Sequence, residues 1–239
     1  MSHVEIRDLN GMAEFRRAED LQNAVWGRED TADPADLMMV IQHEGGLVAG
    51  AFQDSGLIGY IFGFPTRDLS IQHSHRLAVL PKARGLGLGL RLKRYQRDWC
   101  LEHGITHVRW TFDPLRATNA HLNIGRLGAR VTTYHVDYYG AMEGINQGTP
   151  SDRLLADWFL LSPGATALAA GKTAPDAPTV LRLPIPRDFA TLLDTDRAAA
   201  LAHRLRVRDV TLKALDEGLS ITGFDATEPA YLFTATPSR

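Results

Sequence analysis

Residues 75–90 decide the fold, and their sequence is HRLAVLPKARGLGLGL. The stretch begins with β-prone residues, and Pro81 closes that run. Apolar residues then recur every three or four positions as far as Gly104, which predicts a long helix. A glycine-rich loop joins the two elements, with glycines at Gly85, Gly87 and Gly89. The sequence therefore predicts a strand, a glycine-rich loop and a helix N-terminus in direct succession.

This junction predicts an anion-binding site. The first N–H groups of a helix have no partner within the helix, and the helix dipole is positive at that end. Glycines permit positive φ and remove the Cβ atoms that would keep a pyrophosphate from the backbone. Four basic residues are expected around the mouth of the site, namely Lys82, Arg84, Arg91 and Lys93. The alternative is a tight strand-to-helix turn without a ligand.

Two common phosphate-binding patterns do not fit. The dinucleotide pattern requires a third glycine where Leu90 stands, and the mononucleotide loop requires a Lys-Ser/Thr pair that is missing from the loop. Ala170–Thr173 has such a pair but lacks the earlier glycine and is followed by prolines, so it is interpreted as linker.

Hydrophobic periodicity predicts the other elements. A strand is expected at 3–9, a helix at 12–27 and a second helix after Asp33, whose side chain is expected to cap it. Short β-prone runs at 47–52, 57–64 and 71–80 predict an antiparallel meander. Further elements are a strand at 106–112, a helix at 118–127, and strands at 130–138 and 154–161. Their alternation implies at least one parallel crossover.

A domain boundary is predicted near residue 163. Residues 163–179 are rich in Ala, Thr, Gly and Pro and contain too few bulky apolar residues for a core, so we expect a flexible linker. The main domain is then 1–162. Residues 180–239 form a smaller strand-helix-strand extension with a helix at 195–217. In that helix Arg204, Arg206 and Arg208 are interpreted as a solvated face rather than a patch for acidic ligands.

The pattern Arg84-x-x-Gly87-x-Gly89 after a strand resembles the acyl-CoA signature of the GNAT N-acetyltransferase superfamily. The resemblance implies an α+β (mixed α/β) fold with a central mixed, mostly antiparallel sheet flanked by helices. It also implies that backbone groups of Leu77 and Val79 pair with the pantetheine arm, with a bulge at 77–79 that polarises the thioester. Asn119 would be a polar cofactor contact, or alternatively a helix N-cap. The N–H groups of 84–89 would hold the pyrophosphate, from Arg84, Gly85, Leu86, Gly87, Leu88 and Gly89.

The catalytic groups are less clearly marked. Where many family members carry a tyrosine acid this chain has Ile124, which leaves Tyr134, Tyr138, Tyr139, a water or no acid at all. His75 is the candidate base, since His73 and His75 alternate on one strand and share a face. Its alternative is a half-buried strand histidine bonded to backbone. Asp113 and Asp137 are second candidates, although such residues more often serve turns or caps.

A metal site is not predicted, because the His73–His75 pair lacks further ligands at suitable spacing. Net charge is -2 and the pI is about 6.5, which disfavours nucleic acid or anionic lipid as a partner. Cys100 is the single cysteine, and no stretch suggests a signal peptide or membrane span. We therefore expect a soluble, unprocessed protein of the cytoplasm.

These observations together predict an acyltransferase that moves an acetyl or other acyl group from acyl-CoA to an amine. The acceptor is a small-molecule or peptide amine that the residues do not specify, and residues 28–46 and 134–152 are expected to shape its pocket. In the latter segment we expect a wall built by Tyr138-Tyr139-Gly140 and the polar loop Asn146–Asp152. The alternative is a non-catalytic module that binds or senses acyl-CoA. A homodimer is left open.

Overall fold

The structure, a computed structural model, describes residues 3–27, 30–140, 149–175 and 177–235. The chain divides into two compact units, unit 1 (Met1–Val108) and unit 2 (Arg109–Arg239).

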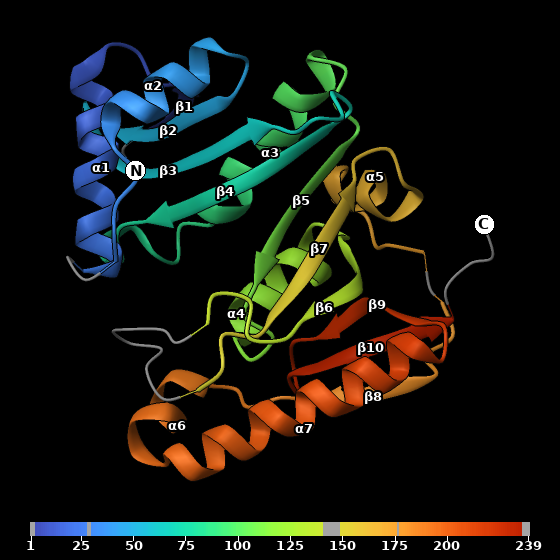
Figure 1. Cartoon of the computed structure of the whole chain (residues 1–239). Helices are drawn as coiled ribbons and strands as arrows, with labels where there is room; N and C mark the ends of the chain where they lie inside the picture. Colours follow the sequence, from blue (N-terminus) through green and yellow to red (C-terminus); the bar gives the residue numbers. More distant parts are fainter. Residues whose placement is uncertain (1–2, 28–29, 141–148, 176, 236–239) are drawn as a thin grey trace. The chain divides into compact units, whose positions relative to one another are not determined.

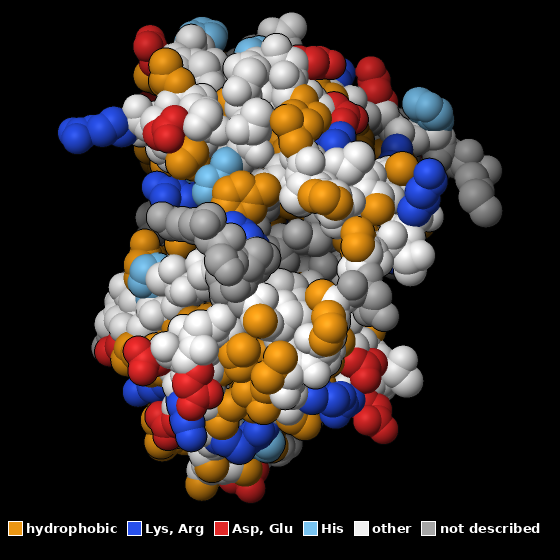
Figure 2. Space-filling model, turned by 90° about the vertical axis from the view of Figure 1, so that its right-hand side faces the viewer, with side chains coloured by type: hydrophobic (Ala, Val, Ile, Leu, Met, Phe, Trp, Pro, Cys, Tyr) orange, Lys and Arg blue, Asp and Glu red, His pale blue; other side chains and the backbone are white. Residues whose placement is uncertain are grey.

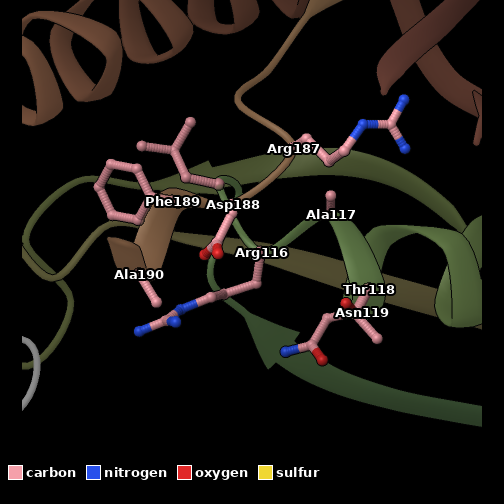
Figure 3. A pocket seen from close by; sticks show the side chains of 9 residues that line it. Arg116, Ala117, Thr118, Asn119, Arg187, Asp188, Phe189 and Ala190 are labelled. Atoms are coloured by element: carbon pink, nitrogen blue, oxygen red, sulfur yellow. The ribbon is translucent and has the colours of Figure 1, made fainter. Parts of the chain in front are cut away.

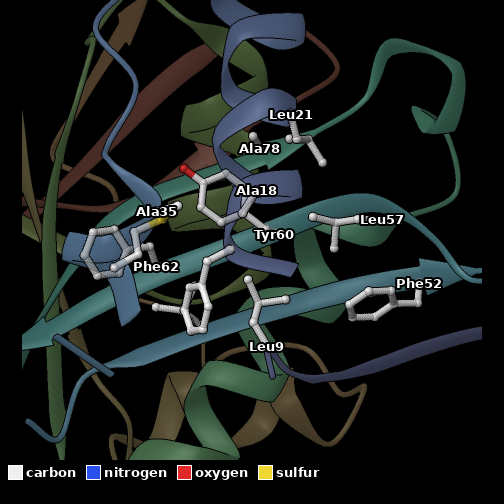
Figure 4. Packing of buried hydrophobic residues seen from close by; sticks show 12 residues of the cluster. Leu9, Ala18, Leu21, Ala35, Phe52, Leu57, Tyr60, Phe62 and Ala78 are labelled. Atoms are coloured by element: carbon white, nitrogen blue, oxygen red, sulfur yellow. The ribbon is translucent and has the colours of Figure 1, made fainter. Parts of the chain in front are cut away.

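Unit 1 is a four-stranded antiparallel sheet in the order β1-β2-β3-β4, with helices on both faces (Figure 1). The central strands β2 and β3 are buried along almost their whole length, because successive side chains point to opposite faces and both faces are covered. One core joins the sheet to α1 and α2 and centres on Tyr60 and Phe62 (Figure 4). The other packs Leu88 and Leu92 of α3 against the opposite face. The elements are β1 (Val4–Asp8), α1 (Met12–Trp26), α2 (Ala35–His43), β2 (Leu47–Gln53), β3 (Gly56–Pro65), β4 (Ile71–Val79), a 3₁₀ turn (Pro81–Ala83) and α3 (Leu88–Glu102).

A β-bulge interrupts β4. Phe62 of β3 lies opposite Arg76, whereas the next residue, Gly63, lies opposite Ser74, so His75 is the extra residue. From Leu77 to Val79 the register with β3 is regular. The bulge expected at 77–79 is therefore two to four residues earlier, at His75.

The start of α2 also differs from expectation. Asp33 does not cap the helix, which begins at Ala35 without a side-chain cap from its own N-terminus. Glu19 of α1 supplies the oxygen instead, accepting a 2.9 Å hydrogen bond from the N–H of Ala35. The carboxylate of Asp33 is thus directed to β4.

Unit 2 holds a sheet in the order β5-β7-β6-β9-β10-β8. The pairs β7–β6, β6–β9, β9–β10 and β10–β8 are antiparallel. With unit 1 this confirms the α+β class with a mostly antiparallel sheet flanked by helices. The elements are β5 (His107–Phe112), α4 (Ala117–Ala120) continuing into a π-helical turn (His121–Arg126), β6 (Arg130–His135), β7 (Arg153–Phe159), α5 (Pro163–Ala169), β8 (Leu181–Pro184), α6 (Phe189–Thr195), α7 (Arg197–Asp216), β9 (Leu219–Asp225) and β10 (Ala230–Ala235).

The C-terminal segment belongs to the same compact unit as residues 109–162. Strand β9 joins the edge of β6, with Val131 opposite Ile221. The stretch expected to be a flexible linker begins with helix α5, whose first turn is capped by Ser162 accepting from the N–H of Ala165 at 3.3 Å. The extension thus continues the sheet of unit 2.

Two buried or half-buried ion pairs fix α7. Arg204, only 2% exposed, makes a two-point contact with Asp113 at 2.7 and 2.9 Å. Arg208 does the same with Asp152, at 2.7 and 2.9 Å. The prediction of a solvated arginine face was therefore wrong at these two positions and holds only for the exposed Arg206. The acidic partners lie far away in the sequence, so the local sequence pattern did not indicate these ion pairs.

Acidic and basic side chains are interspersed on the face that Figure 2 shows, in keeping with the small net charge. Within the described ranges, no helix combines the length and apolar character needed to cross a bilayer.

Candidate active site

The loop before α3 has the geometry of an anion cradle. Gly85 and Gly87 have φ of 86° and 68°, conformations that side-chain-bearing residues rarely adopt. A Cβ at either position would meet no atom within 4 Å, so the space on the Cβ side of each glycine is open. Gly87 is the N-cap of α3, and the first bond of the helix runs from the N–H of Arg91 to its carbonyl at 3.1 Å.

The N–H groups that follow are therefore available. Those of Leu88, Gly89 and Leu90 precede the first helical bond and have no partner within the helix. Gly89 itself lies in the first helical turn, so its expected positive φ is not adopted. The N–H of Arg84 is already donated to the carbonyl of Pro81 at 3.2 Å. The cradle thus runs from Gly85 to Leu90, with Leu86 exposed beside it and Leu88 anchored in the core.

Only two of the four basic residues expected at this mouth keep that role. Lys82 and Arg84 are exposed. Arg91 donates to the carbonyl of Val4 at 2.8 Å. Lys93 is 2% exposed and points beneath β4, so the prediction that it supplies mobile charge was wrong.

Lys93 belongs to a buried polar network between α3 and β4. Its Nζ donates to Ser74 Oγ at 2.8 Å and to Gln96 Oε1 at 3.1 Å. Gln96 in turn donates to Gln72 Oε1 at 2.6 Å, and Cys100 Sγ lies 3.4 Å from the same oxygen. Burial lowers the pKa of Lys93 to about 7 and raises the pKa of Cys100 to about 12. The network fixes β4 just before its bulge.

His75 sits on the bulge and is 36% exposed. Its Nε2 lies 3.1 Å from Asp33 Oδ1. The ring is flanked by Phe62 and Phe64, with centroids 5.4 and 5.5 Å away, and by His73 at 6.1 Å. The shared face predicted for His73 and His75 is therefore present. His75 contacts a carboxylate, so the alternative of a strand histidine bonded to the backbone does not hold.

Leu77 and Val79 continue β4 beyond the bulge. Both are half-buried, and their side chains pack against the core shared with α3. Their proposed contact with a pantetheine arm would use backbone groups, and it stays a prediction.

Asn119 lies in unit 2 and is exposed. Helix α4 begins at Ala117, so Asn119 is not its N-cap, and that alternative is excluded. It lines an open cavity of about 240 Å³ together with Arg116 and residues 187–190 of the C-terminal segment (Figure 3). The extension therefore helps to line the space beside a predicted cofactor contact.

The tyrosines of unit 2 differ in availability. Tyr134 is buried and donates to Asp152 at 2.6 Å, and burial together with that carboxylate raises its pKa, which makes it a poor acid. Tyr138 is 49% exposed, with its ring 4.8 Å from those of Tyr139 and His135. Tyr138 remains the candidate acid. Ile124 is buried in the core.

Asp113 and Asp137, the second candidates for the base, have structural roles. Burial would raise the pKa of Asp113, but Arg204 outweighs it and holds the pKa below its usual value. Asp137 accepts from the N–H of Ser151 at 3.0 Å and closes a turn. Of the polar loop expected at Asn146–Asp152, residues 146–148 lie outside the described residues.

Sequence reasoning missed Asp33 and Arg76 as neighbours of His75. Arg76 Nε lies 3.1 Å from Asp33 Oδ2, and its NH2 group contacts Asp30 at 3.0 Å. The available signal was the adjacent pair His75-Arg76, because a bulge can place two consecutive side chains on the same face of a strand. Among the described residues no cluster of three or more His, Cys, Asp or Glu side chains could hold a metal ion.

With this geometry in place, comparisons with known proteins identify the class. Residues 12–123 match the acetyltransferase (GNAT) family and form a GNAT acetyltransferase domain. Residues 12–123 are thus an acyl-CoA-dependent N-acetyltransferase domain, and the general reaction of that family is acyl transfer from CoA. No curated protein matches the chain.

Solved structures share the fold at low identity. The ribosomal-protein-S18-alanine N-acetyltransferase from Escherichia coli is 17% identical, with a TM-score of 0.54, over 65% of this chain and 92% of that one. The protein yncA from Salmonella typhimurium with its cofactor acetyl-CoA is 20% identical, with a TM-score of 0.56, over 74% and 100%. An aminoglycoside 6'-N-acetyltransferase complexed with coenzyme A is 14% identical, with a TM-score of 0.53, over 66% and 98%.

Proposed function

We propose that this enzyme transfers an acetyl group from acetyl-CoA to a primary amine of a small molecule or peptide. The observation that carries the proposal is the pair of positive-φ glycines, Gly85 and Gly87, before a 15-residue helix whose first N–H groups have no partner within the helix. A diphosphate fits such a cradle, because it accepts several N–H bonds at the positive end of the helix dipole. Lys82 and Arg84 add charge beside it.

His75 is the proposed base. As the amine nitrogen forms its bond to the carbonyl carbon and the carbon-sulfur bond breaks, the amine must release a proton, and an imidazole within reach can accept it. Tyr138 is the proposed acid, supplying the proton that the departing thiolate takes up. In the proposed complex, backbone groups of Leu77 and Val79 and the side chain of Asn119 contact the cofactor.

One observation supports a second candidate, a non-catalytic acyl-CoA-binding module. Ile124, buried in the core, stands where many members of the family carry a tyrosine acid. Thiol release from acetyl-CoA, measured against a panel of small primary amines and short peptides, separates the two functions. We expect turnover with at least one amine and loss of that turnover in Gly87→Asp. Acetyl-CoA binding without thiol release across the panel would favour the module.

We also propose a cytoplasmic location. The single cysteine, Cys100, supports it, because this residue is buried and forms no disulfide. A homodimer is tested by sedimentation equilibrium of the full chain. A domain boundary near residue 163 likewise stays a proposal, to be tested by limited proteolysis.

A further inference from the structure

The carboxylate of Asp33 joins two adjacent residues of β4. Oδ1 lies 3.1 Å from His75 Nε2, and Oδ2 lies 3.1 Å from Arg76 Nε. The Asp33 side chain is 15% exposed, while the His75 side chain is 36% exposed. One ring nitrogen of the histidine is thus held inward by a carboxylate, and the other, Nδ1, has no hydrogen-bond partner among the described residues.

The bulge explains how neighbouring residues reach one carboxylate. In a regular strand His75 and Arg76 would point to opposite faces. The extra residue in β4 brings both side chains to the face covered by α1 and α2, while Ser74 points to the opposite face, toward Lys93. The arrangement is therefore a consequence of the bulge.

Arg76 fixes the position of Asp33. Besides Asp33 it contacts Asp30 at 3.0 Å and the carbonyl of Thr31 at 2.9 Å, and its guanidinium lies 4.9 Å from the ring of Trp26. These contacts tie the segment before α2 to β4. Because the guanidinium of Arg76 pairs with Oδ2 as an ion pair, Oδ1 is the oxygen that contacts His75.

We propose that Asp33 is a positioning residue that accepts the Nε2–H of His75 and so leaves Nδ1 as the atom that takes the proton from the acceptor amine. This inference rests on the proposed role of His75 as base. A histidine whose tautomer and orientation are set by a carboxylate is ready to accept a proton at its other nitrogen, without a change of ring orientation.

The variant Asp33→Asn tests the inference by inverting one hydrogen bond. The positive guanidinium of Arg76, 3.1 Å from Oδ2, attracts the asparagine oxygen and repels its NH2 group, so the NH2 group faces His75. The neutral ring must then accept at Nε2 and carry its hydrogen on Nδ1, the wrong tautomer for the proposed reaction. Asp30→Asn is the matched control, because it removes the same charge from the same segment without touching His75.

The first readout needs no acceptor. Long-range ¹H–¹⁵N spectra of the neutral His75 ring are expected to show Nε2–H in the wild type and in Asp30→Asn, and Nδ1–H in Asp33→Asn. A wild-type ring protonated on Nδ1, or the same tautomer in wild type and Asp33→Asn, overturns the inference.

The second readout is turnover with the best amine from the thiol-release panel. We expect His75→Gln and Asp33→Asn each to lower kcat by about 10²-fold or more, with KM for acetyl-CoA unchanged and Asp30→Asn close to wild type. If His75→Gln lowers kcat but Asp33→Asn behaves like Asp30→Asn, the positioning role is refuted while the base stands. If His75→Gln leaves kcat unchanged, the proposed base itself fails.

Discussion

Lys93 of α3 donates a 2.8 Å hydrogen bond from Nζ to Ser74 Oγ, one residue before the bulge that carries His75. The helix that presents the anion cradle is thereby bonded directly to the strand that presents the candidate base. Since Ser74, Lys93 and Gln96 are all buried, this bond is shielded from water.

Replacing Lys93 by methionine should stabilise the protein at pH 6. The folded chain binds a proton on Lys93 only below about pH 7, whereas the unfolded chain does so below about 10.5. Between pH 7 and pH 10.5 the unfolded chain therefore binds more protons than the folded chain. The free energy of unfolding of the wild type accordingly rises with pH across this range. At pH 6 the wild type carries the full cost of a buried charge. We expect Lys93→Met to gain at least about 1.4 kcal/mol there, the free energy of one pKa unit.

Urea denaturation between pH 6 and pH 9 measures both effects, and the variant should show a flatter pH dependence. Lys82→Met is the control, because Lys82 is exposed in the same unit. A variant whose stability changes between pH 6 and pH 9 as much as that of the wild type would contradict the lowered pKa of Lys93.

Gly87→Asp should weaken acetyl-CoA binding at least about tenfold, or about 1.4 kcal/mol. The substitution places a carboxylate where the diphosphate is proposed to bind, and like charges repel. Gly87→Asn has nearly the same shape and tolerance of positive φ, and it should bind more tightly than the aspartate variant. Isothermal titration calorimetry gives the affinities.

Gly104→Asp is the matched control for backbone strain. Gly104 follows the other end of α3, has φ of 74°, and has no atom within 4 Å of a Cβ position. If Gly87→Asp, Gly87→Asn and wild type bind acetyl-CoA with equal affinity, the loop does not bind the cofactor.

Tyr138→Phe should lower kcat by about 10²-fold while leaving thermal stability unchanged. The hydroxyl is the proposed proton donor, and general acids contribute about 10²–10⁴-fold to rates. Stability should hold because the side chain is half exposed. Thiol release at saturating substrates measures kcat, and Tyr139→Phe serves as the neighbouring control. If both variants are equally active, the acid is not Tyr138.

Arg208→Met should destabilise the protein by about 3–5 kcal/mol at pH 7, because it leaves the buried carboxylate of Asp152 without its cation. Burial would raise the pKa of Asp152, but Arg208, Tyr134 and the N–H of Asp137 outweigh burial and keep the pKa low. The stabilisation is therefore present above pH 4 and is lost as pH falls through the folded pKa. The gap between wild type and variant should narrow in acid.

Urea titrations at pH 7 and pH 3.5 measure that gap. The double variant Arg208→Met/Asp152→Asn should recover part of the loss, since it removes the unpaired charge. Lys213→Met, which breaks the exposed pair with Glu217, should cost less than about 1 kcal/mol. A gap that stays constant with pH would argue against Asp152 as the source.

The sequence predicted the features that depend on local pattern. The glycine loop, the long helix after it and the meander of unit 1 all follow from periodicity and turn residues, and each lies within a few residues of its expected bounds. The positive φ of Gly85 and Gly87 and the position of the helix start were predictable because they arise from adjacent residues, whereas anion binding there stays a prediction.

The errors arise where a partner lies far along the chain. Lys93 was expected in solvent because its partner Ser74 precedes it by 19 residues. Arg204 was expected in solvent although Asp113, 91 residues earlier, pairs with it. Asp33 was expected to cap α2, but Glu19 supplies that oxygen, 16 residues away. Periodicity assigns a face to each side chain and contains no information about distant charges.

The pairing of Asp113 and Asp152 with α7 has a consequence for synthesis on the ribosome. Both carboxylates are made well before residues 197–216, so Asp113 waits for an arginine made 91 residues later and Asp152 for one made 56 residues later. Strand β6 likewise waits for β9. Unit 2 can therefore reach its final packing only after α7 and β9 have been synthesised, whereas unit 1 is free to fold earlier.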